Sequence, residues 1–401
     1  MKATISTQPT GAQLRAMDLA ELRAHIRTLI TLDESEAPLV SAYVPIGRHG
    51  ANPNPFEARV REIRKLLTAD EMGLFEEPFE RALQFLRREV RPPTRGVAAF
   101  ARGGNRPFFL GLQFQVPVPE RLSVSPTPDV YHLVELKDTY HRYVVLISTA
   151  ESARILEVNL GAITREVWTE RPELRERVGR EWTQAHYQDH RRERGERFAK
   201  EKVELLERLM DGGGHTHLIL AGNPRMTAQI RKHLPKRLLD KLVDAVPASG
   251  NARAEDIVEA TLATFIDRER QESLDAVAEL FAAIKRGGLA AAGTKETLAA
   301  LRRGQADVLV MGKHDALGPA WTCRKCGWVE AISARPESCQ VCGSSELKIE
   351  NLREVMVRLA ERQGLEVEIV ERSDVLTSLG GVGCLLRYAN RECADRGEGD
   401  E

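Results

Sequence analysis

Cysteine is missing from the first 322 residues of this 401-residue chain. All six cysteines lie at or beyond position 323, and four of them form two closely spaced pairs. This distribution does not suit the disulfide framework of a secreted protein. We therefore expect four metal ligands and two isolated thiols.

Long hydrophobic runs are also missing. No stretch approaches the roughly 20 consecutive apolar residues that cross a bilayer, and residues 1–6 lack the apolar run of a signal peptide. With 42% hydrophobic and 29% charged residues, the chain can still bury cores, and its length suggests two or three domains. We expect a soluble cytoplasmic protein with no membrane partner.

Neither sign of charge is in excess. Lys and Arg number 58 and Asp and Glu 59, for a formal net charge of -1. This balance excludes a protein that binds nucleic acid through a uniformly basic surface, so any basic surface must be local, and no DNA partner is expected. The acidic residues 395–401 are expected to form a disordered tail.

Hydrophobic periodicity predicts an α/β multidomain protein. Residues 1–125 are expected to form an N-terminal α/β domain. Two proline-containing stretches, 116–119 and 125–128, are expected to end its sheet and begin a linker. The helices predicted in this domain are 14–30, 56–68 and 74–90, and the strands are 39–44, 96–101 and 108–114.

The remainder is predicted to form two further domains. Residues 126–270 would hold a three-stranded meander followed by a charged helical segment, and residues 271–401 an α/β sandwich. Helix 254–285 would connect them. The middle-domain elements predicted are strands 143–148, 153–158, 162–168, 217–221 and 242–246 and helix 224–232; those of the last domain are helices 294–302 and 352–363 and strands 307–311, 367–370 and 383–388.

Four cysteines predict a structural zinc ion. Cys323 and Cys326 form one pair, and Cys339 and Cys342 form a second, each followed directly by glycine. Each pair can offer two thiolates from a tight turn, and glycine tolerates the backbone conformation that such a turn imposes. Four thiolates close a tetrahedral shell and leave no position for an activated water, so one zinc would be structural. The ribbon, residues 320–345, would be inserted into the last domain.

Two other interpretations of these cysteines remain open. They could be redox-active or unliganded, or they could hold iron. The remaining two, Cys384 in a strand-like run and Cys393 in the polar tail, are predicted to be a packing thiol and a surface thiol.

A charged segment in the middle of the chain is the candidate for a local basic surface. Residues 175–202 contain nine Lys and Arg against six Asp and Glu, together with two histidines. Such a helix could contact a polyanion through its arginines. It could equally be a solvated helix with internal ion pairs.

The same segment resembles a known family. Residues 179–187, Gly-Arg-Glu-Trp-Thr-Gln-Ala-His-Tyr, and 190–194, His-Arg-Arg-Glu-Arg, are similar to the central loop and helix of class-one release factors and Pelota. They look most like the bacterial archaeo-eukaryotic release-factor-like proteins, which include the hibernation factor Balon. The preceding strands resemble that family's ribonuclease-H-like middle domain. Residues 217–222 are similar to its next strand, and 304–310 and 379–388 to its third domain, which carries a zinc insertion in some members.

The resemblance implies a role for Gln184. In release factors this loop carries Gly-Gly-Gln, and the glutamine helps to place the water that attacks peptidyl-tRNA. Here Trp182 and Thr183 occupy the glycine positions, which argues against hydrolysis because both carry a β-carbon. The family's stop-codon reader, Asn-Ile-Lys-Ser with a Tyr-x-Cys pattern, is also missing.

The expected function is therefore a ribosome-binding factor that occupies the A site without reading a codon, in hibernation, rescue or quality control. Ribosomal RNA would be its partner, together with P-site tRNA and an elongation-type GTPase. One alternative is a peptidyl-tRNA hydrolase that uses Gln184, and another is a zinc-ribbon RNA-binding protein with no ribosomal role. The residues that the resemblance implies in RNA contact are Arg180, Trp182, His186, His190, Arg191, Arg192, Arg194 and Arg197.

Overall fold

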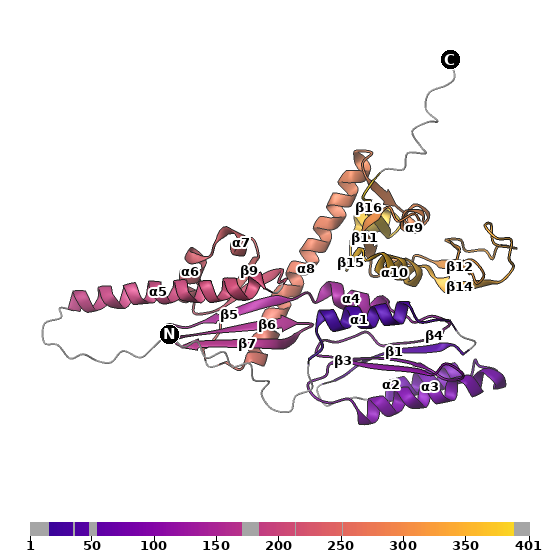
Figure 1. Cartoon of the computed structure of the whole chain (residues 1–401), viewed down its shortest axis with the longest axis horizontal. Helices are drawn as coiled ribbons and strands as arrows, with labels where there is room; N and C mark the ends of the chain where they lie inside the picture. The colour runs from indigo at the N-terminus through magenta and orange to yellow at the C-terminus, as the bar shows by residue number, and fades with distance from the viewer. Residues whose placement is uncertain are drawn as a thin grey trace, which may run out of the picture.

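The computed structural model describes residues 16–34, 37–47, 54–170, 184–212, 214–250 and 252–388. Within these ranges there are four separate sheets. Three of them pack against helices, and the smallest lies next to a cysteine cluster. Figure 1 shows the N-terminal and middle sheets side by side, with the C-terminal sheet beyond helix α4. The predicted fold class, a multidomain α/β protein with a cysteine ribbon in its last domain, is confirmed.

The N-terminal sheet is antiparallel in the order β3-β2-β1-β4. Its central strand alternates between two cores, because successive side chains of a strand point to opposite faces. Val40 and Val44 face α2 and α3, whereas Leu39 and Tyr43 face α1. The elements are α1 Leu19–Ile30, β1 Leu39–Pro45, α2 Asn54–Arg64, α3 Ala69–Arg88, β2 Gly96–Arg102, β3 Phe108–Phe114 and β4 Arg121–Ser125.

Two predictions for this domain were wrong in detail. The first helix starts at Leu19 and not at residue 14, because Asp18 caps it: the Asp18 side chain accepts from the Glu21 N–H, and Glu21 reaches back to the Asp18 N–H. Strand β4 lies between the two proline stretches that were expected to begin a linker, and it pairs with β1.

The middle sheet has the order β7-β6-β5-β8-β9. The predicted meander is confirmed as β5 Tyr143–Ser148, β6 Ser152–Asn159 and β7 Ala162–Glu170, which are antiparallel. Strands β8 His217–Gly222 and β9 Leu242–Val246 continue the sheet in parallel with β5. Helices α5 Gln184–Asp211 and α6 Pro224–His233 share a core with one face, α8 Ala254–Lys285 covers the other, and the short α7 Lys236–Leu239 precedes β9. Every residue of β5 and β8 is consequently buried.

The C-terminal sheet has the order β10-β16-β11-β15, and the ribbon is inserted between β11 and α10 as predicted. Helix α8 is shared: Phe265 packs in the middle-domain core, whereas Val277 and Leu280 pack against the C-terminal sheet. No helix among the described residues has both the length and the apolar character of a membrane span. The elements are β10 Ala290–Ala292, α9 Thr294–Arg302, β11 Ala306–Gly312, α10 Leu352–Gln363, β15 Glu366–Val370, α11 Asp374–Ser378 and β16 Val382–Leu386.

Helix α4, Tyr131–Thr139, joins the domains and was not predicted. Leu133, Val134 and Leu136 are buried in one core with residues of α1 and α10. Figure 1 shows α4 between the N-terminal and C-terminal units. Because its neighbours cover most of its surface, α4 lacks the single apolar stripe by which an amphipathic helix is recognised in a sequence.

Buried carboxyl groups hold both ends of α4. The Glu354 carboxyl on α10 accepts the Val130 N–H at 2.9 Å and the Tyr131 N–H at 3.2 Å, where the first turn of a helix has no internal partners. At the other end Asp138 accepts the Ile369 N–H of β15 at 2.9 Å. Burial raises the pKa of Glu354 well above its usual value, and the nearby Asp129 charge raises it further.

Replacing Glu354 tests how much its buried carboxyl group contributes to stability where α10 meets α4. Because the pKa of Glu354 is higher in the fold than in the unfolded chain, its protonated form stabilises the fold below about pH 4.5, and this stability is lost as the pH rises through the folded pKa. Glu354→Gln keeps an acceptor for the α4 N–H groups and cannot ionise. We expect the variant to exceed the parent by about 1–3 kcal/mol of unfolding free energy at pH 8, with little difference at pH 4.5.

Thermal melting across this pH range measures the effect. A Glu354→Leu variant serves as the control, because it leaves the two N–H groups unpaired and should be less stable than the Gln variant at every pH. Parallel pH profiles for the parent and the Gln variant would contradict the assignment.

Candidate metal centre and projecting helix

The cysteine ribbon is a small three-stranded antiparallel sheet in the order β13-β12-β14. Its strands are β12 Pro319–Cys323, β13 Val329–Glu330 and β14 Leu347–Asn351. The first cysteine pair begins at Cys323, the last residue of β12, which pairs with Leu347 of β14, and the second pair precedes β14. The sheet therefore brings together two turns that are far apart in the ribbon sequence.

The two cysteine turns have the same backbone geometry. The Gly327 N–H donates to the Cys323 carbonyl at 2.9 Å, and the Gly343 N–H donates to the Cys339 carbonyl at 2.8 Å. Gly327 has φ 74° and Gly343 has φ 70°. Both lie in the left-handed region that favours glycine, which confirms the reason given for a glycine after each pair.

Four thiols converge between these turns. The Sγ atoms of Cys323 and Cys342 are 3.5 Å apart, those of Cys326 and Cys339 are 3.6 Å apart, and all four lie within 4.8 Å of one another. These distances exceed a disulfide bond, about 2.05 Å. They come close to the separation of roughly 3.8 Å between thiolates bound tetrahedrally at 2.3 Å from one ion. The four predicted ligands can thus hold one metal ion.

The ionisation of these thiols also fits a cation. The Cys326 N–H lowers the pKa of Cys323 to about 7, and the Cys342 N–H lowers that of Cys339. The Trp328 N–H lowers the pKa of Cys326, but burial and hydrogen bonds with the other thiols raise it overall to about 12. Four adjacent thiolates would therefore need a bound cation at neutral pH. Cys384 lies elsewhere, in β16, where burial raises its pKa to about 12, and Cys393 lies outside the described residues.

Polar contacts fix the ribbon against the N-terminal domain. Lys348 of β14 pairs with Glu34, which follows α1. Arg358 of α10 contacts Glu350 of β14 at 2.5 Å and donates to Thr127 at 2.8 Å. The ribbon is thus held between its own domain and the first one.

Helix α5 carries the other predicted site, and the structure describes only part of it. Arg180 and Trp182 lie outside the described residues. Gln184 is the first residue of α5, so the segment expected as a loop is already helical from this point. The side chains of Gln184, His186, His190 and Arg191 are not described.

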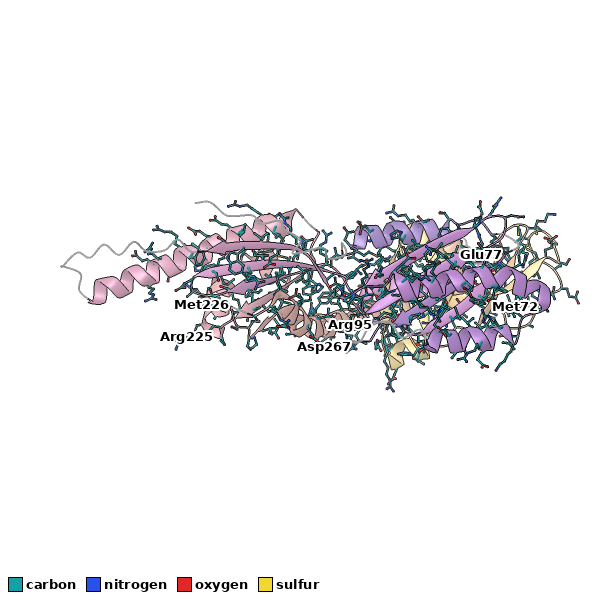
Figure 2. The ribbon with its side chains drawn as sticks, turned by 90° about the horizontal axis from the view of Figure 1, so that it is seen from below. Met72, Glu77, Arg95, Arg225, Met226 and Asp267 are labelled. Carbon is teal, nitrogen blue, oxygen red and sulfur yellow. The ribbon has the colours of Figure 1, made fainter. Side chains whose placement is uncertain are left out.

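The first half of α5 projects from the middle domain. Burial begins at Phe198, and no residue from 192 to 197 is buried. Beyond that point Val203 and Leu206 pack in one core with Ile230 of α6. Figures 1 and 2 both show α5 running past the end of the sheet. Figure 2 labels Arg225 and Met226 at the start of α6, the helix that packs beside the second half of α5.

The described arginines of the projecting part are available for other contacts. Arg192 lies 3.8 Å from Glu196, but their side chains are 82% and 52% exposed, so the pair is weak. Arg197 is exposed and Arg194 is half-buried, and neither forms an ion pair among the described residues. Three arginines and two glutamates in residues 192–197 give this part a small positive excess.

Lys202 was counted as surface charge, and this was wrong. Its side chain is buried, with Nζ donating to the Ser148 hydroxyl at 3.0 Å and to the Thr149 carbonyl at 2.6 Å. The same ammonium lies 4.2 Å from the centre of the Phe198 ring. Lys202 therefore attaches α5 to the end of β5 and does not contribute to the surface charge of the helix.

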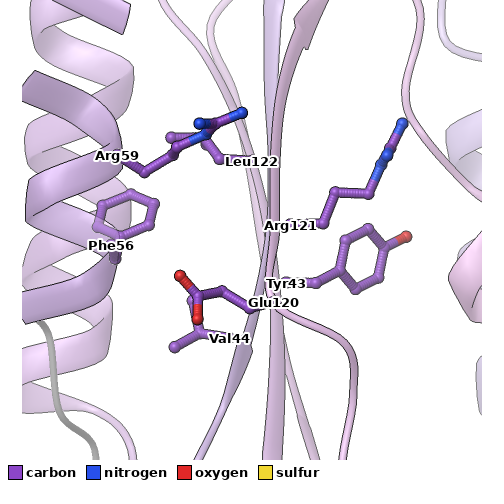
Figure 3. A pocket seen from close by; sticks show the side chains of 7 residues that line it. All are labelled: Tyr43, Val44, Phe56, Arg59, Glu120, Arg121 and Leu122. Carbon is purple, nitrogen blue, oxygen red and sulfur yellow. The ribbon is translucent and has the colours of Figure 1, made fainter. Parts of the chain in front are cut away.

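A pocket in the N-terminal domain offers no catalytic arrangement. Its volume is about 290 Å³, and Figure 3 shows Arg59 and Arg121 on either side of the strands. Arg121 donates to Asp129 at 2.6 Å, and the Tyr43 hydroxyl donates to the Asp129 carbonyl at 2.6 Å. The residues that line the pocket are Tyr43, Val44, Phe56, Arg59, Glu120, Arg121 and Leu122, and they include no nucleophile beside a general base.

Comparison with known families identifies the middle domain as a release-factor-like domain. Residues 128–265, from just before α4 through part of α8, match the sequence model of one such family. That family is the bacterial archaeo-eukaryotic release factor family 10. The predicted resemblance to a release-factor-like family is thereby confirmed over this segment.

Curated relatives occur in Mycobacterium tuberculosis. Uncharacterised proteins of strains H37Rv and CDC 1551 are each 30% identical to the chain over 188 residues. The match covers 46% of this chain and 48% of each relative. The chain thus spans about half the length of these relatives.

Solved structures with lower similarity come from archaea and yeast. The archaeal translation termination factor aRF1 is 17% identical, with 93% of this chain and 99% of that chain covered and a TM-score of 0.26. Pelota of Archaeoglobus fulgidus is 14% identical, with 94% of each chain covered and a TM-score of 0.35. Dom34 of S. cerevisiae is 13% identical, with 74% and 82% covered and a TM-score of 0.37.

The metal centre is tested by removing one ligand. We expect Cys326→Ser to weaken Co²⁺ binding and to lower the thiolate-to-metal charge-transfer absorption that Co²⁺ gives in the ribbon, because only three thiolates remain to bind the ion. Cys384→Ser is the matched control and should retain the absorption, since that thiol lies in β16. Absence of such absorption in the unaltered protein would exclude the site.

Proposed function

We propose that the protein is a ribosome-binding factor of the release-factor type, which occupies the A site without reading a stop codon. The observation that carries this proposal is the family match over residues 128–265, which includes the whole of α5. The proposed partners are ribosomal RNA, P-site tRNA and an elongation-type GTPase. Hibernation, rescue and quality control are the processes in which such a factor would act, in the cytoplasm.

The geometry of α5 supports contact with RNA at a distance from the core. A helix of 28 residues spans about 42 Å, and its packed half begins only at Phe198. The part before Phe198 would carry Arg192, Arg194 and Arg197 to phosphates and hold the Gln184 end further out. The proposed contacts also include Arg180, Trp182, His186, His190 and Arg191.

Two further assignments accompany the proposal. We infer that the ion of the ribbon is zinc in a structural role, because four thiolates favour zinc and fill its coordination shell. We also propose domain boundaries after residues 125 and 270. The second falls within α8, between Phe265, which packs on the middle sheet, and Val277, which packs on the C-terminal sheet.

Charge reversal on the projecting part of α5 tests ribosome binding. Arg192→Glu with Arg197→Glu changes two exposed arginines before Phe198, and we expect at least a tenfold loss of affinity in sedimentation with purified ribosomes at low salt. The matched control is Lys200→Glu with Arg208→Glu, an equal charge change at two exposed positions in the packed half of the same helix. This control variant should lose less affinity for ribosomes. Equal losses would mean that the projecting part has no special role, and an unaltered protein that stays in the supernatant would refute the proposal.

The alternative function, peptide release, has its own test. If Gln184 orients a water for attack on peptidyl-tRNA, Gln184→Ala should lower the rate of peptide release from stalled ribosomes by at least tenfold, without loss of ribosome binding. Under our proposal the unaltered protein releases no peptide above background. If the unaltered protein releases peptide and Gln184→Ala does not, the protein is a catalytic release factor and does not merely occupy the A site.

A further inference from the structure

A second group of metal-ligating side chains lies apart from the ribbon, where α8 passes from the middle domain toward the C-terminal domain. His217 is the first residue of β8, and Glu269 and Glu272 lie one turn apart on α8. One ligand atom of each lies within 4.8 Å of the others. Figure 2 labels Asp267, which lies two residues before Glu269 on the same helix.

One ring nitrogen of His217 can bind a given ion, and the spacing from Nε2 suits this role. His217 Nε2 lies 3.1 Å from Glu272 Oε1, whereas the other ring nitrogen, Nδ1, lies 3.3 Å from Glu269 Oε1 and 2.8 Å from the Thr216 hydroxyl. His141, which precedes β5, places Nδ1 at 3.1 Å from the other oxygen of Glu269. Ligand atoms bound at about 2.1 Å from one ion lie roughly 3.0–3.4 Å apart.

Burial leaves one carboxylate oxygen without a donor. The side chains of His217 and Glu269 are only 6% and 10% exposed. Glu269 Oε1 is buried and accepts no hydrogen bond among the described residues; His217 Nδ1 is 3.3 Å away but lies closer, at 2.8 Å, to the Thr216 hydroxyl. A buried carboxylate oxygen in this state indicates a missing partner, because such atoms are normally satisfied.

Negative charge accumulates around the same point. Burial raises the pKa of Asp138 and of Glu368, and the Glu269 charge contributes to both shifts. Among the described residues, Arg268 donates its Nε to Glu272 at 2.8 Å. Glu269 also lines a cavity of about 500 Å³ between the domains, together with Arg270 and Lys313.

We propose that His217, Glu269 and Glu272, with His141 beside them, bind a divalent transition-metal ion that connects β8 to α8. An imidazole with two carboxylates suits Zn²⁺ or Mn²⁺, in contrast to the thiolate set of the ribbon. The ion would hold α8 in a fixed orientation on the middle sheet. Just beyond it, the Ser273 hydroxyl donates to Glu368 of the C-terminal domain at 3.3 Å, so the ion would stabilise the joint between the two domains.

A proton could occupy the same place. A protonated His217 would donate one N–H toward each glutamate and need no metal. The two arrangements are distinguishable because a metal requires neutral histidine and excludes that proton.

The experiment titrates the full-length protein, with its ribbon intact, with Mn²⁺ at pH 7.5 and measures free Mn²⁺ by electron paramagnetic resonance. Thiolates do not favour Mn²⁺, so the ribbon should contribute nothing to the signal. We expect one saturable site from which Zn²⁺ displaces Mn²⁺, and a rise in melting temperature on metal addition. Glu272→Gln should weaken binding at least tenfold and remove the rise. Glu272 is chosen because its side chain is 38% exposed and its change disturbs packing least.

The matched control is Glu279→Gln, the same chemical change at an exposed position on the same helix, and it should bind like the parent. Failure of both Mn²⁺ and Zn²⁺ to bind outside the ribbon, or binding that Glu272→Gln leaves unchanged, would overturn the proposal. A melting temperature that depends on pH but not on metal would assign the group to a protonated His217 and would equally overturn it.

Discussion

The arrangement of the domains depends on the burial of α4 between the N-terminal and C-terminal units. Its apolar residues complete a core that neither unit closes alone. One end of α4 is held by the Glu354 carboxyl of α10, and the other by the Ile369 N–H of β15, which Asp138 accepts. Removing a carboxyl group from water is costly unless it is hydrogen-bonded or protonated. The Glu354 carboxyl meets both conditions, since it accepts two N–H groups and its pKa is raised.

The release-factor-like domain is consequently fixed on two sides. Residues 128–265 begin just before α4, which is wedged against the first and third domains, and end in α8, which continues into the third. Within this frame Lys202 attaches the base of α5 to β5, so the projecting part starts from a rigid point. A helix held in this way can present side chains to a large partner without first ordering its own backbone.

The sequence predicted features whose signals are local. The two cysteine pairs, each followed by glycine, predicted the four thiols that the ribbon brings together, and helix 254–285 was predicted with its true ends. Signals that depend on distant residues were missed. Helix α4 is apolar on several sides and follows prolines, and Lys202 gave no sign that it would be buried. His217 and Glu269 are separated in the sequence by α6, α7, β9 and the first half of α8.

Helix α8 has a mechanical consequence of its own. Its 32 residues form one unbroken rod whose first half belongs to the middle sheet and whose second half belongs to the C-terminal sheet. Continuous backbone hydrogen bonding makes such a rod stiff, and it carries no proline at which to bend. The middle and C-terminal sheets are therefore joined by a continuous helix, and their relative orientation follows from where each of them packs along it.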